Sequence, residues 1–539
     1  MTLFRIALRA QRTGFIATVL IGALSGLLNS VAYVQVAGAT PAERAVFAHQ
    51  MEILGRQLVY LLPRPVQLDT MGGYLTWRDL GTISTIFAVW AMLAATGAGR
   101  GDEERGLTEA WLASGVSRAR WIATRCLAFL GVAAASVVVS LAVTAAGAAI
   151  SGDPLPLAGV VAQCLPVLAM TVWGFGLGLV VAQLVGTRRA ASVVGGVVIV
   201  ALFTLNSTLR AGADPGPIKW LSPFYLFERS SPLLAGGGLD GQATVAMALE
   251  AVAFAAVAIY AFGRRDIGGT VIRGRASTAR PSHRPSGDPL LRLPVLAAID
   301  QQRGWIIGWA VAMTALGYFL ASLARTLLDS FRDIRSLQVY LSAMGIASVV
   351  DVVGVIWFST ALLIICIFVV AQVNGWAADD AEGRLETVLA AGASRMRVVL
   401  ERIGALLVAA GIVAVVSTTG VLLSARALDI AVPADRMLFA ALLMLPVVFA
   451  LGAIGHALVG WRPRIAVVLI AAVAFVSYFM QEFAPLFGWP EWVQRTSLFV
   501  LYGAPVTKID WAGAITLTGM GIAGTAFALA AMRRRDVGR

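Results

Sequence analysis

Few residues in this chain have the types and spacing that catalysis or metal binding needs. The three histidines, His49, His283 and His456, are scattered along the chain with no repeated metal-ligand spacing. The three cysteines fall inside or at the ends of apolar runs, at spacings that match neither a zinc motif nor a redox pair. We therefore expect no catalytic residue and no metal site in this chain.

The lysines also exclude a phosphate-binding loop. Such a loop needs a lysine followed by serine or threonine after a glycine-rich turn, because the lysine and the backbone amides hold the phosphates. The chain has two lysines, Lys219 followed by Trp220 and Lys508 followed by Ile509. We expect no nucleotide cofactor in this chain, so any energy-requiring work must draw on a partner ATPase or on an ion gradient.

One arrangement of charged residues occurs twice in the chain. GDEERGLTEAWLASGVSRARW occupies residues 101–121, and ADDAEGRLETVLAAGASRMRV occupies residues 378–398. The positions that are identical in the two copies are Asp102 and Asp379, Gly106 and Gly383, Glu109 and Glu386, Leu112 and Leu389, Ala113 and Ala390, Gly115 and Gly392, Ser117 and Ser394, Arg118 and Arg395, and Arg120 and Arg397. Repetition of so many polar residues indicates a shared role.

The repeated segment predicts a short helix that presents a carboxylate. We expect the first copy to be helical from about Leu107 to Ala113, because Gly115 favours a helix end and Ser117 can cap the next helix. The carboxylate then lies among apolar side chains, which are Leu107, Trp111 and Leu112 around Glu109, and Leu385, Val388 and Leu389 around Glu386. Such a surface suits a protein partner; a solvated interfacial loop is the alternative.

The composition places these segments in a membrane protein. Of the 539 residues, 58% are hydrophobic and 13% are charged, whereas soluble domains contain about 25% charged residues. The mean hydropathy is +0.81, and apolar runs of about 20 residues, long enough to cross a bilayer, recur along the chain. Backbone groups in lipid must be hydrogen-bonded within the segment, and the runs lack the alternation of barrel strands. The predicted fold class is an all-α polytopic membrane protein.

Twelve apolar runs predict twelve transmembrane helices. Lys and Arg are more frequent in the alternate loops that share a side with the N-terminus, so we expect both termini in the cytoplasm of a bacterium and the chain in its plasma (inner) membrane. The expected spans are 15–37, 80–98, 126–149, 157–184, 190–209, 243–262, 304–324, 350–373, 403–425, 437–459, 465–481 and 512–532.

The two halves of the chain read as an internal duplication. QRTGFI at Gln11 matches QRGWII at Gln302, and LVGTR at Leu184 matches LVGWR at Leu458. RRDIG and RRDVG close the two halves. We expect parallel six-span repeats at residues 1–268 and 294–539, joined by a cytoplasmic linker rich in Arg, Pro and Ser at residues 269–293. A transport pathway between the repeats is the natural expectation.

Two loops on the outer side predict amphipathic helices. One lies around AERAVFAHQMEILGRQLVYLL within residues 39–79, with Phe47, Leu58 and Leu61 on roughly one face. The other is DSFRDIRSLQVYLSAM before the eighth span.

Polar residues inside the spans are candidates for a substrate pathway, because they are costly in lipid. Glu250 is the one clear intramembrane acid that we identify, and it could meet a cationic or hydrogen-bonding substrate; pairing with a neighbouring helix is the alternative. The weaker candidates are Asn29, Asn206, Gln372, Asn374, His456 and Gln481. Hydrogen bonding between helices also explains most residues of this kind.

The repeated segment resembles the first cytoplasmic loop of type-2 ABC-transporter (ABC exporter) permeases, in its acidic residues followed by G-x-x-E-x-x-L-A-x-G-x-S-R-x-R. With WLSPFYLF from Trp220 and VLYGAPVTK from Val500, the chain resembles the fused twelve-span tetronasin-type polyketide-antibiotic and multidrug efflux permeases. The resemblance implies that the short helices are coupling helices that dock on an ATPase. The implied coupling residues are Asp102, Gly106, Glu109, Leu112, Gly115, Arg118, Asp379, Gly383, Glu386, Leu389, Gly392 and Arg395.

The resemblance also implies the partners. Two coupling helices imply two copies of a separate ABC ATPase subunit, which binds ATP and Mg²⁺, and the cargo is expected to be hydrophobic or amphipathic: antibiotics, drugs or lipids exported by alternating access. The first copy departs from the second by placing Thr108 where the second has Leu385, which predicts inequivalent docking sites.

Two other functional classes remain open from the sequence. A proton-coupled secondary multidrug transporter also commonly has twelve spans in two halves, and Glu250 alone would have to take up the proton there. A membrane scaffold or polymer-export component is the third class. A nucleic-acid partner is not expected, although the net charge is +12, because the basic residues flank the apolar spans.

Overall fold

A computed structural model describes residues 2–57, 62–212, 214, 216–271, 293–331, 349–381, 383–484 and 487–534 of the chain. The chain divides into two compact units, Met1–Ser282 and His283–Arg539, and each is described here by itself.

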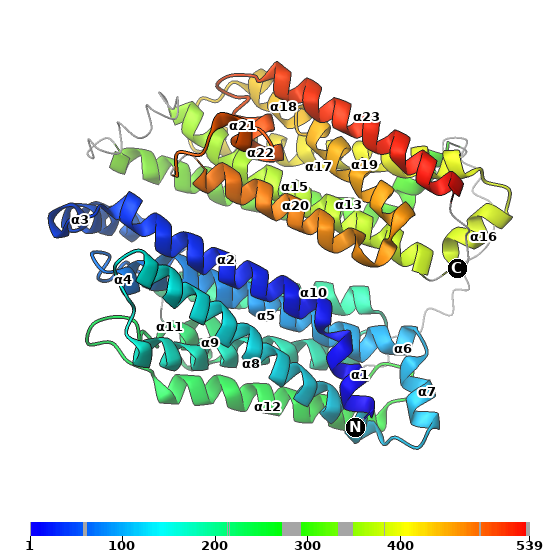
Figure 1. The fold of residues 1–539 in the computed structure, drawn as a ribbon, viewed down its shortest axis with the longest axis horizontal. Coiled ribbons are helices and arrows are strands. Elements are labelled where there is room, and N and C mark those ends of the chain that lie inside the picture. The colour runs from blue at the N-terminus through cyan, green and yellow to red at the C-terminus, as the bar shows by residue number, and fades with distance from the viewer. Residues whose placement is uncertain are drawn as a thin grey trace. The chain divides into compact units, whose positions relative to one another are not determined.

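The first unit is built of helices of very different length. They are α1 Thr2–Ala10, α2 Arg12–Ala37, α3 Pro41–Gln57, α4 Met71–Leu75, η1 Thr76–Leu80, α5 Gly81–Thr96, η2 Gly97–Gly101, α6 Asp102–Glu104, α7 Leu107–Ala113, α8 Arg118–Ile150, α9 Leu157–Leu184, α10 Arg188–Arg210, η3 Gly216–Leu221, α11 Pro223–Glu228 and α12 Gly241–Arg264. The segments η1 and η2 are π-helical turns and η3 is a 3₁₀-helix. Figure 1 shows α3 and α4 at one end of this bundle and α1, α6 and α7 at the other.

The second unit contains a similar series. Its helices are α13 Pro294–Phe331, α15 Val349–Ala381, α16 Arg384–Ala390, α17 Arg395–Ala427, α18 Ala434–Leu442, α19 Leu445–Trp461, α20 Pro463–Phe483, α21 Glu491–Gln494, α22 Leu498–Tyr502 and α23 Trp511–Arg534. Within this unit, α16 lies at the end of the bundle opposite to α21 and α22 (Figure 1).

The described residues contain twelve helices long and apolar enough to span a membrane, which confirms the all-α fold class and the number of spans. The predicted ends hold within a few residues for most of them. The largest difference is in the second span, which runs from Met71 to Glu104 as α4, η1, α5, η2 and α6, whereas residues 80–98 were expected. The expected start was too late because the polar run around Arg78 and Asp79 lowers the local hydropathy.

Local sequence explains where several helices begin. The Ser117 hydroxyl accepts a hydrogen bond from the backbone N–H of Arg120 at the start of α8, and the Ser394 hydroxyl accepts one from Arg397 at the start of α17. Asp240 caps α12 by accepting from the N–H of Ala243 at 2.9 Å, and this bond, with the Arg229 guanidinium at 2.7 Å, lowers the pKa of the Asp240 carboxyl.

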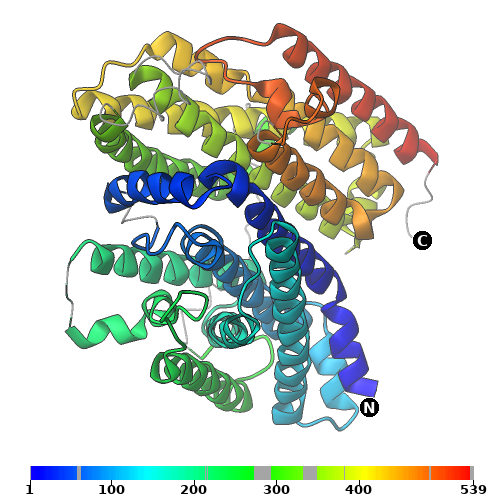
Figure 2. The ribbon, with the colours of Figure 1, turned by 60° about the vertical axis from the view of Figure 1, so that its left-hand side comes forward.

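The helices pair in the same order in the two units. In the first unit α2 packs along α8, α5 along α9, and α9 along α12 (Figure 2). In the second unit the corresponding pairs are α13 with α17, α15 with α19, and α19 with α23. Small residues permit these close contacts, since a side chain at Gly174 or Gly178 of α9 would collide with the backbone oxygens of Ala88 and Met92. This is the pairing that an internal duplication would give.

The predicted outer helices are described in part. The first is present as α3, in which Phe47 is buried and Val46 is 57% exposed, while Leu58 and Leu61 lie outside the described residues. The segment predicted before the eighth span lies mostly outside the described residues, and so does most of the predicted linker at 269–293.

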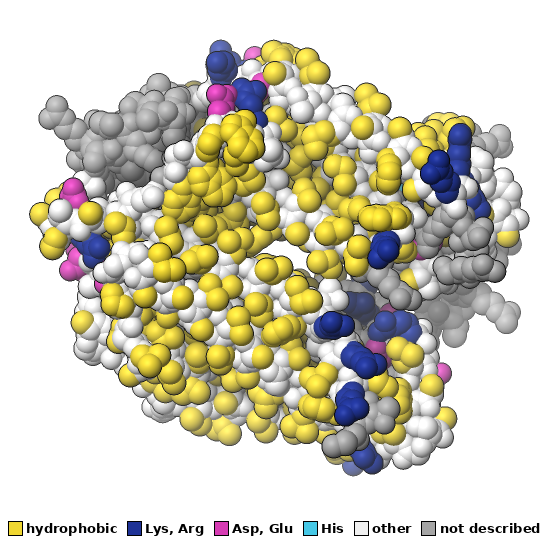
Figure 3. All heavy atoms as spheres, in the orientation of Figure 1, with side chains coloured by type: hydrophobic (Ala, Val, Ile, Leu, Met, Phe, Trp, Pro, Cys, Tyr) yellow, Lys and Arg dark blue, Asp and Glu magenta, His cyan; other side chains and the backbone are white. Residues whose placement is uncertain are grey.

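The surface follows the expected division between lipid and water. On the face shown in Figure 3, hydrophobic side chains cover the middle of the helices of the first unit, and Lys and Arg side chains gather at the end that contains α1 and α7. This end therefore suits the aqueous side of a membrane.

Candidate functional site

The short helix α7 presents one face to solvent and one to the bundle. It has the predicted bounds, Leu107–Ala113, with Gly106 before it and Gly115 after it in left-handed backbone conformations, at φ of 69° and 87°. Glu109 is exposed and forms no ion pair with any described residue, and Leu107 beside it is 42% exposed. Trp111 and Leu112 pack against the buried core instead of facing outward. Leu112 thus helps to hold the helix against its unit.

The counterpart α16 has the same design. Gly383 and Gly392 have φ of 71° and 90°, and Glu386 is exposed with no ion pair to a described residue. Val388 is 47% exposed, whereas Leu389 packs against the core of the second unit. Each short helix therefore exposes one carboxylate next to one apolar side chain.

The departure at Thr108 lies on the inner face of α7. Thr108 is 0% exposed and its counterpart Leu385 is 3% exposed, so both side chains point into their own unit. The difference at this position therefore lies inside each unit, and the inequivalence of the two docking sites stays a prediction.

The repeated aspartates form ion pairs with the third and ninth spans. Asp102, with 7% of its side chain exposed, binds Arg125 of α8 at 2.6 Å and Arg105 at 2.5 Å. At the matching position Asp379 binds Arg402 of α17 at 3.2 Å and Arg384 at 3.1 Å. These aspartates anchor the loop, and Asp102 is buried beneath it in two ion pairs.

The repeated arginines anchor the other end of the loop. Arg118 donates to the carbonyl oxygens of Phe262 at 2.9 Å and Arg265 at 2.6 Å, at the C-terminus of α12. Arg395 donates to the carbonyl oxygen of Met532 at 2.7 Å, at the C-terminus of α23. Unsatisfied carbonyls at a helix C-terminus favour such a cation. Arg118 and Arg395 therefore tie the loop to the last helix of each unit and do not belong to its exposed face.

Aromatic contacts extend this anchoring into α7. The Arg125 guanidinium lies over the Trp121 ring at 4.4 Å, and the Trp121 and Trp111 rings lie 6.3 Å apart. Trp121 is 2% exposed. The chain of contacts from Asp102 through Arg125 and Trp121 to Trp111 connects the third span to the short helix, so the two should move together.

The first unit adds a buried ionic network behind the loop. Glu103 is bound by Arg100 at 3.0 Å and by both terminal nitrogens of Arg265. Arg265 also donates to Gln183 at 2.7 Å, and Arg100 donates to the carbonyl oxygen of Gly269 at 2.9 Å. The network joins η2, α6 and α9 to the segment after α12.

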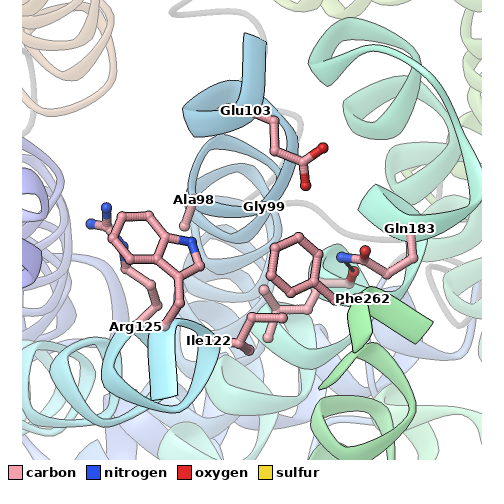
Figure 4. Close-up of a pocket in the computed structure, with 9 residues that line it drawn as sticks. Ala98, Gly99, Glu103, Ile122, Arg125, Gln183 and Phe262 are labelled. Atoms are coloured by element: carbon pink, nitrogen blue, oxygen red, sulfur yellow. Dashed lines mark hydrogen bonds between the residues drawn. The ribbon is translucent and has the colours of Figure 1, made fainter. Parts of the chain in front are cut away.

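A small cavity lies beside this network. Its volume is about 10 Å³, room for about one water molecule. Figure 4 shows Glu103, Gln183, Phe262 and Arg125 around it. Arg125 Nε is buried without a hydrogen-bond partner among the described residues. A cavity of this size cannot hold an antibiotic-sized molecule.

The candidate pathway residues are not brought together within either unit. In the first unit Asn29 bonds Asp79, Asn206 donates to Glu228 at 2.8 Å, and Glu250 accepts from the Trp173 indole at 2.8 Å.

In the second unit Gln372 donates to Gln302 at 2.6 Å and Gln481 to Ser359 at 3.5 Å. Asn374 is exposed. His456 is 1% exposed beside Trp376, and neither ring nitrogen has a partner among the described residues. In both units these are mainly local contacts between neighbouring helices.

Asp79 corrects the expectation that Glu250 is the one intramembrane acid. Asp79 is 2% exposed in η1 of the second span. Its Oδ1 accepts from Ser25 at 2.5 Å and from Asn29 at 3.1 Å, and its Oδ2 has no partner among the described residues. Sequence reasoning placed Asp79 outside the span, and a polar cluster with Asn29 was the missed signal.

Arg125, Arg402 and Glu103 are the other functional candidates that sequence reasoning missed. A signal for the arginines was present, because Arg125 and Arg402 occupy matching positions in two otherwise apolar segments. Among the residues that the structure describes, no group of histidine, cysteine or acidic side chains could hold a metal ion.

Comparison with known families supports a transport role. Residues 291–533 match a family model described as "Multidrug efflux system permease Rv1217c, C-terminal domain". A comparison with curated proteins gave no match. The matched residues cover most of the second unit and somewhat less than half of the chain. The second half of this multi-pass membrane protein is therefore similar to the permease domain of a multidrug efflux system.

Proposed function

We propose that this chain is the permease subunit of an ATP-driven exporter whose ATPase is a separate polypeptide. In this proposal α7 and α16 are coupling helices, and each seats on one copy of the ATPase subunit. ATP and Mg²⁺ bind in that partner, and its conformational cycle switches the permease between inward and outward access. Both termini and the two short helices lie on the cytoplasmic side of a bacterial plasma membrane.

The repeated anchoring of the two short helices is the observation that supports this proposal most. Each helix is held on one side by an aspartate that pairs with an arginine of the next span. On the other side, an arginine donates to a carbonyl oxygen at the C-terminus of the last helix of the unit. Its exposed face nevertheless keeps a glutamate that has no ion pair with a described residue, beside an apolar side chain. A helix that is anchored on both sides and exposes a carboxylate beside an apolar side chain suits a partner that transmits movement through it.

The cargo in this proposal is a hydrophobic or amphipathic small molecule. The printed description of the matching family names multidrug efflux. The spans are rich in apolar side chains, and pockets for such compounds are mostly apolar with few polar groups.

Purified chain alone is expected to hydrolyse no ATP. The reason is that neither lysine stands in a phosphate-binding loop. A phosphate-release assay on the chain in nanodiscs tests this, with the reconstituted chain plus its ATPase subunit as the positive control. Hydrolysis by the chain alone, retained through further purification, would contradict the proposal.

Proton-coupled transport is the second candidate, and Asp79 is the observation that favours it. Asp79 is a buried carboxyl inside a span, and one of its oxygens has no partner among the described residues, so it can take up and release a proton.

The substitution Asp79→Asn separates the two candidates. The amide oxygen can still accept from Ser25 and Asn29, so the local packing is kept while the proton site is lost. We expect ATP-driven efflux of a fluorescent hydrophobic dye from proteoliposomes to be unchanged. Dye transport driven by a proton gradient without ATP, and abolished by Asp79→Asn, would instead establish the second candidate.

A further inference from the structure

The two docking helices are mounted differently on their units. In the first unit, Glu103 is 7% exposed and its carboxylate is enclosed by two guanidinium groups. Gly268 also donates its backbone N–H to this carboxylate at 3.3 Å. The loop before α7 is therefore fixed to η2, to α9 and to the segment after α12.

Three polar side chains of this mounting have alanine counterparts in the second unit. By the alignment of the repeats, Ala377 stands at the position of Arg100, Ala457 at that of Gln183, and Ala381 at that of Glu104. Ala377 and Ala457 cannot form the side-chain hydrogen bonds that Arg100 and Gln183 form in the first unit. Ala381 lacks the carboxylate of Glu104, which accepts a hydrogen bond of 2.7 Å from the backbone N–H of Arg188 at the start of α10. The second unit therefore lacks three of the polar groups that hold the first loop. Asp380 stands at the position of Glu103, and Arg535, at the position of Arg265, lies outside the described residues.

The ion pair that both units contain is also more buried and shorter in the first unit than in the second. The side chains of Asp102 and Arg125 are each 7% exposed and their contact is 2.6 Å. In the second unit, 36% of the Asp379 side chain and 15% of the Arg402 side chain are exposed, and the contact is 3.2 Å. Partly exposed pairs are weakened by water and salt, whereas a buried pair is costly to break.

The backbone before the loop also differs. The second span enters α7 through the π-helical turn η2 and the short α6, with Arg100 of η2 buried in the network. The eighth span is one continuous α-helix, Val349–Ala381, and ends directly before α16. The first loop thus follows a π-helical turn that contributes Arg100 to the buried network, while the second loop follows a continuous α-helix.

We propose that the two docking helices differ in how rigidly they are attached to their units. In this proposal α7 is fixed to the first unit and binds one ATPase subunit in a preformed position, while α16 can move relative to the second unit. This inference rests on the proposed function for the identity of the partner, but not for the difference in mounting. In the transport cycle, movement of the ATPase subunits then displaces α16 relative to its unit, while α7 moves only together with the first unit.

Hydrogen exchange measured on the full chain in nanodiscs, without any ATPase, tests the difference in mounting. After correction for intrinsic rates, amides of residues 103–117 should exchange at least about tenfold more slowly than those of residues 380–394, because opening the first loop breaks buried ion pairs. Equal rates, or faster exchange in the first loop, would overturn the inference.

Variants that copy the second unit into the first sharpen the test. Arg100→Ala with Gln183→Ala should raise exchange in residues 103–117 to the level of residues 380–394 and leave the second loop unchanged. If this double variant does not fold, Gln183→Ala alone removes one hydrogen bond of 2.7 Å and should raise exchange in the same segment. The control is Thr204→Ala, an exposed side chain of α10, which should change neither loop. No change in exchange in either network variant would count against the inference.

Addition of the ATPase subunit separates the two proposals. If α7 and α16 are docking helices, the partner should protect both segments, with the larger change in the second loop. Protection of neither segment contradicts the proposed coupling function, while the unequal rates of the isolated chain would still stand.

Discussion

Removing both exposed glutamates, by Glu109→Ala with Glu386→Ala, is expected to lower partner-stimulated ATP turnover at least about tenfold. Glu109 is the one charged side chain of α7. On α16, Glu386 is the one acidic side chain, and Arg384 is the other charged residue. A charged anchor at the centre of a small interface can account for about 2 kcal/mol of binding, which corresponds to roughly thirtyfold in affinity. The measurement is phosphate release by the reconstituted complex, with binding of the ATPase subunit as a second readout.

The matched control is Glu491→Ala. Glu491 is also an exposed glutamate on a short helix, but it lies in α21, at the opposite end of the second unit (Figure 1). Its removal should leave turnover unchanged. The single variants should each have intermediate effects, and Glu386→Ala alone should weaken turnover. If the double variant keeps full stimulation and full binding of the ATPase subunit, α7 and α16 are not the docking helices.

The parts of the fold that could be predicted are those determined by local sequence. Apolar runs longer than a bilayer identify spans whatever their neighbours are, so the twelve helices follow from hydropathy. The bounds of α7 follow from Gly115, which takes a left-handed conformation, and from Ser117, which caps the next helix.

The parts that could not be predicted depend on contacts between distant segments. The second span begins early because Asp79 is hydrogen-bonded by Ser25 and Asn29 of α2, fifty residues or more away. The inward and outward faces of α7 could not be assigned either, because a helix of two turns has too few residues for a periodic pattern. Leu112 and Leu107 differ in exposure only because Trp121 and its neighbours cover one side.

The anchoring residues were partly visible in the repeat. Conservation of Asp102, Arg118 and their counterparts between the halves indicated a shared role, and the resemblance assigned that role to partner contact. The structure assigns these side chains to ion pairs and to helix C-termini instead. Repetition alone cannot distinguish a residue that contacts a partner from one that holds the contacting helix in place.

The second large effect is expected for stability. Glu103→Gln should lower the free energy of unfolding of the first unit by about 3–5 kcal/mol, because it leaves the guanidinium groups of Arg100 and Arg265 buried without a counter-charge. Glutamine keeps the size of the side chain, so the effect reports on charge and not on packing. Denaturation in mixed micelles, followed by the fluorescence of tryptophans such as Trp121, measures it.

The comparison variant in the second unit is Asp379→Asn, in the ion pair that corresponds to Asp102 with Arg125. Because 36% of the Asp379 side chain is exposed, its ion pairs should contribute about 0–1 kcal/mol. A large loss for Glu103→Gln beside a small loss for Asp379→Asn is the expected result. Equally small losses of unfolding free energy, with equally fast exchange in the two loops, would mean that water screens the Glu103 network as well. The first loop would then be held no more firmly than the second. A small loss for both, with slow exchange retained in residues 103–117, would assign the mounting to Trp121 and Arg125 in place of Glu103.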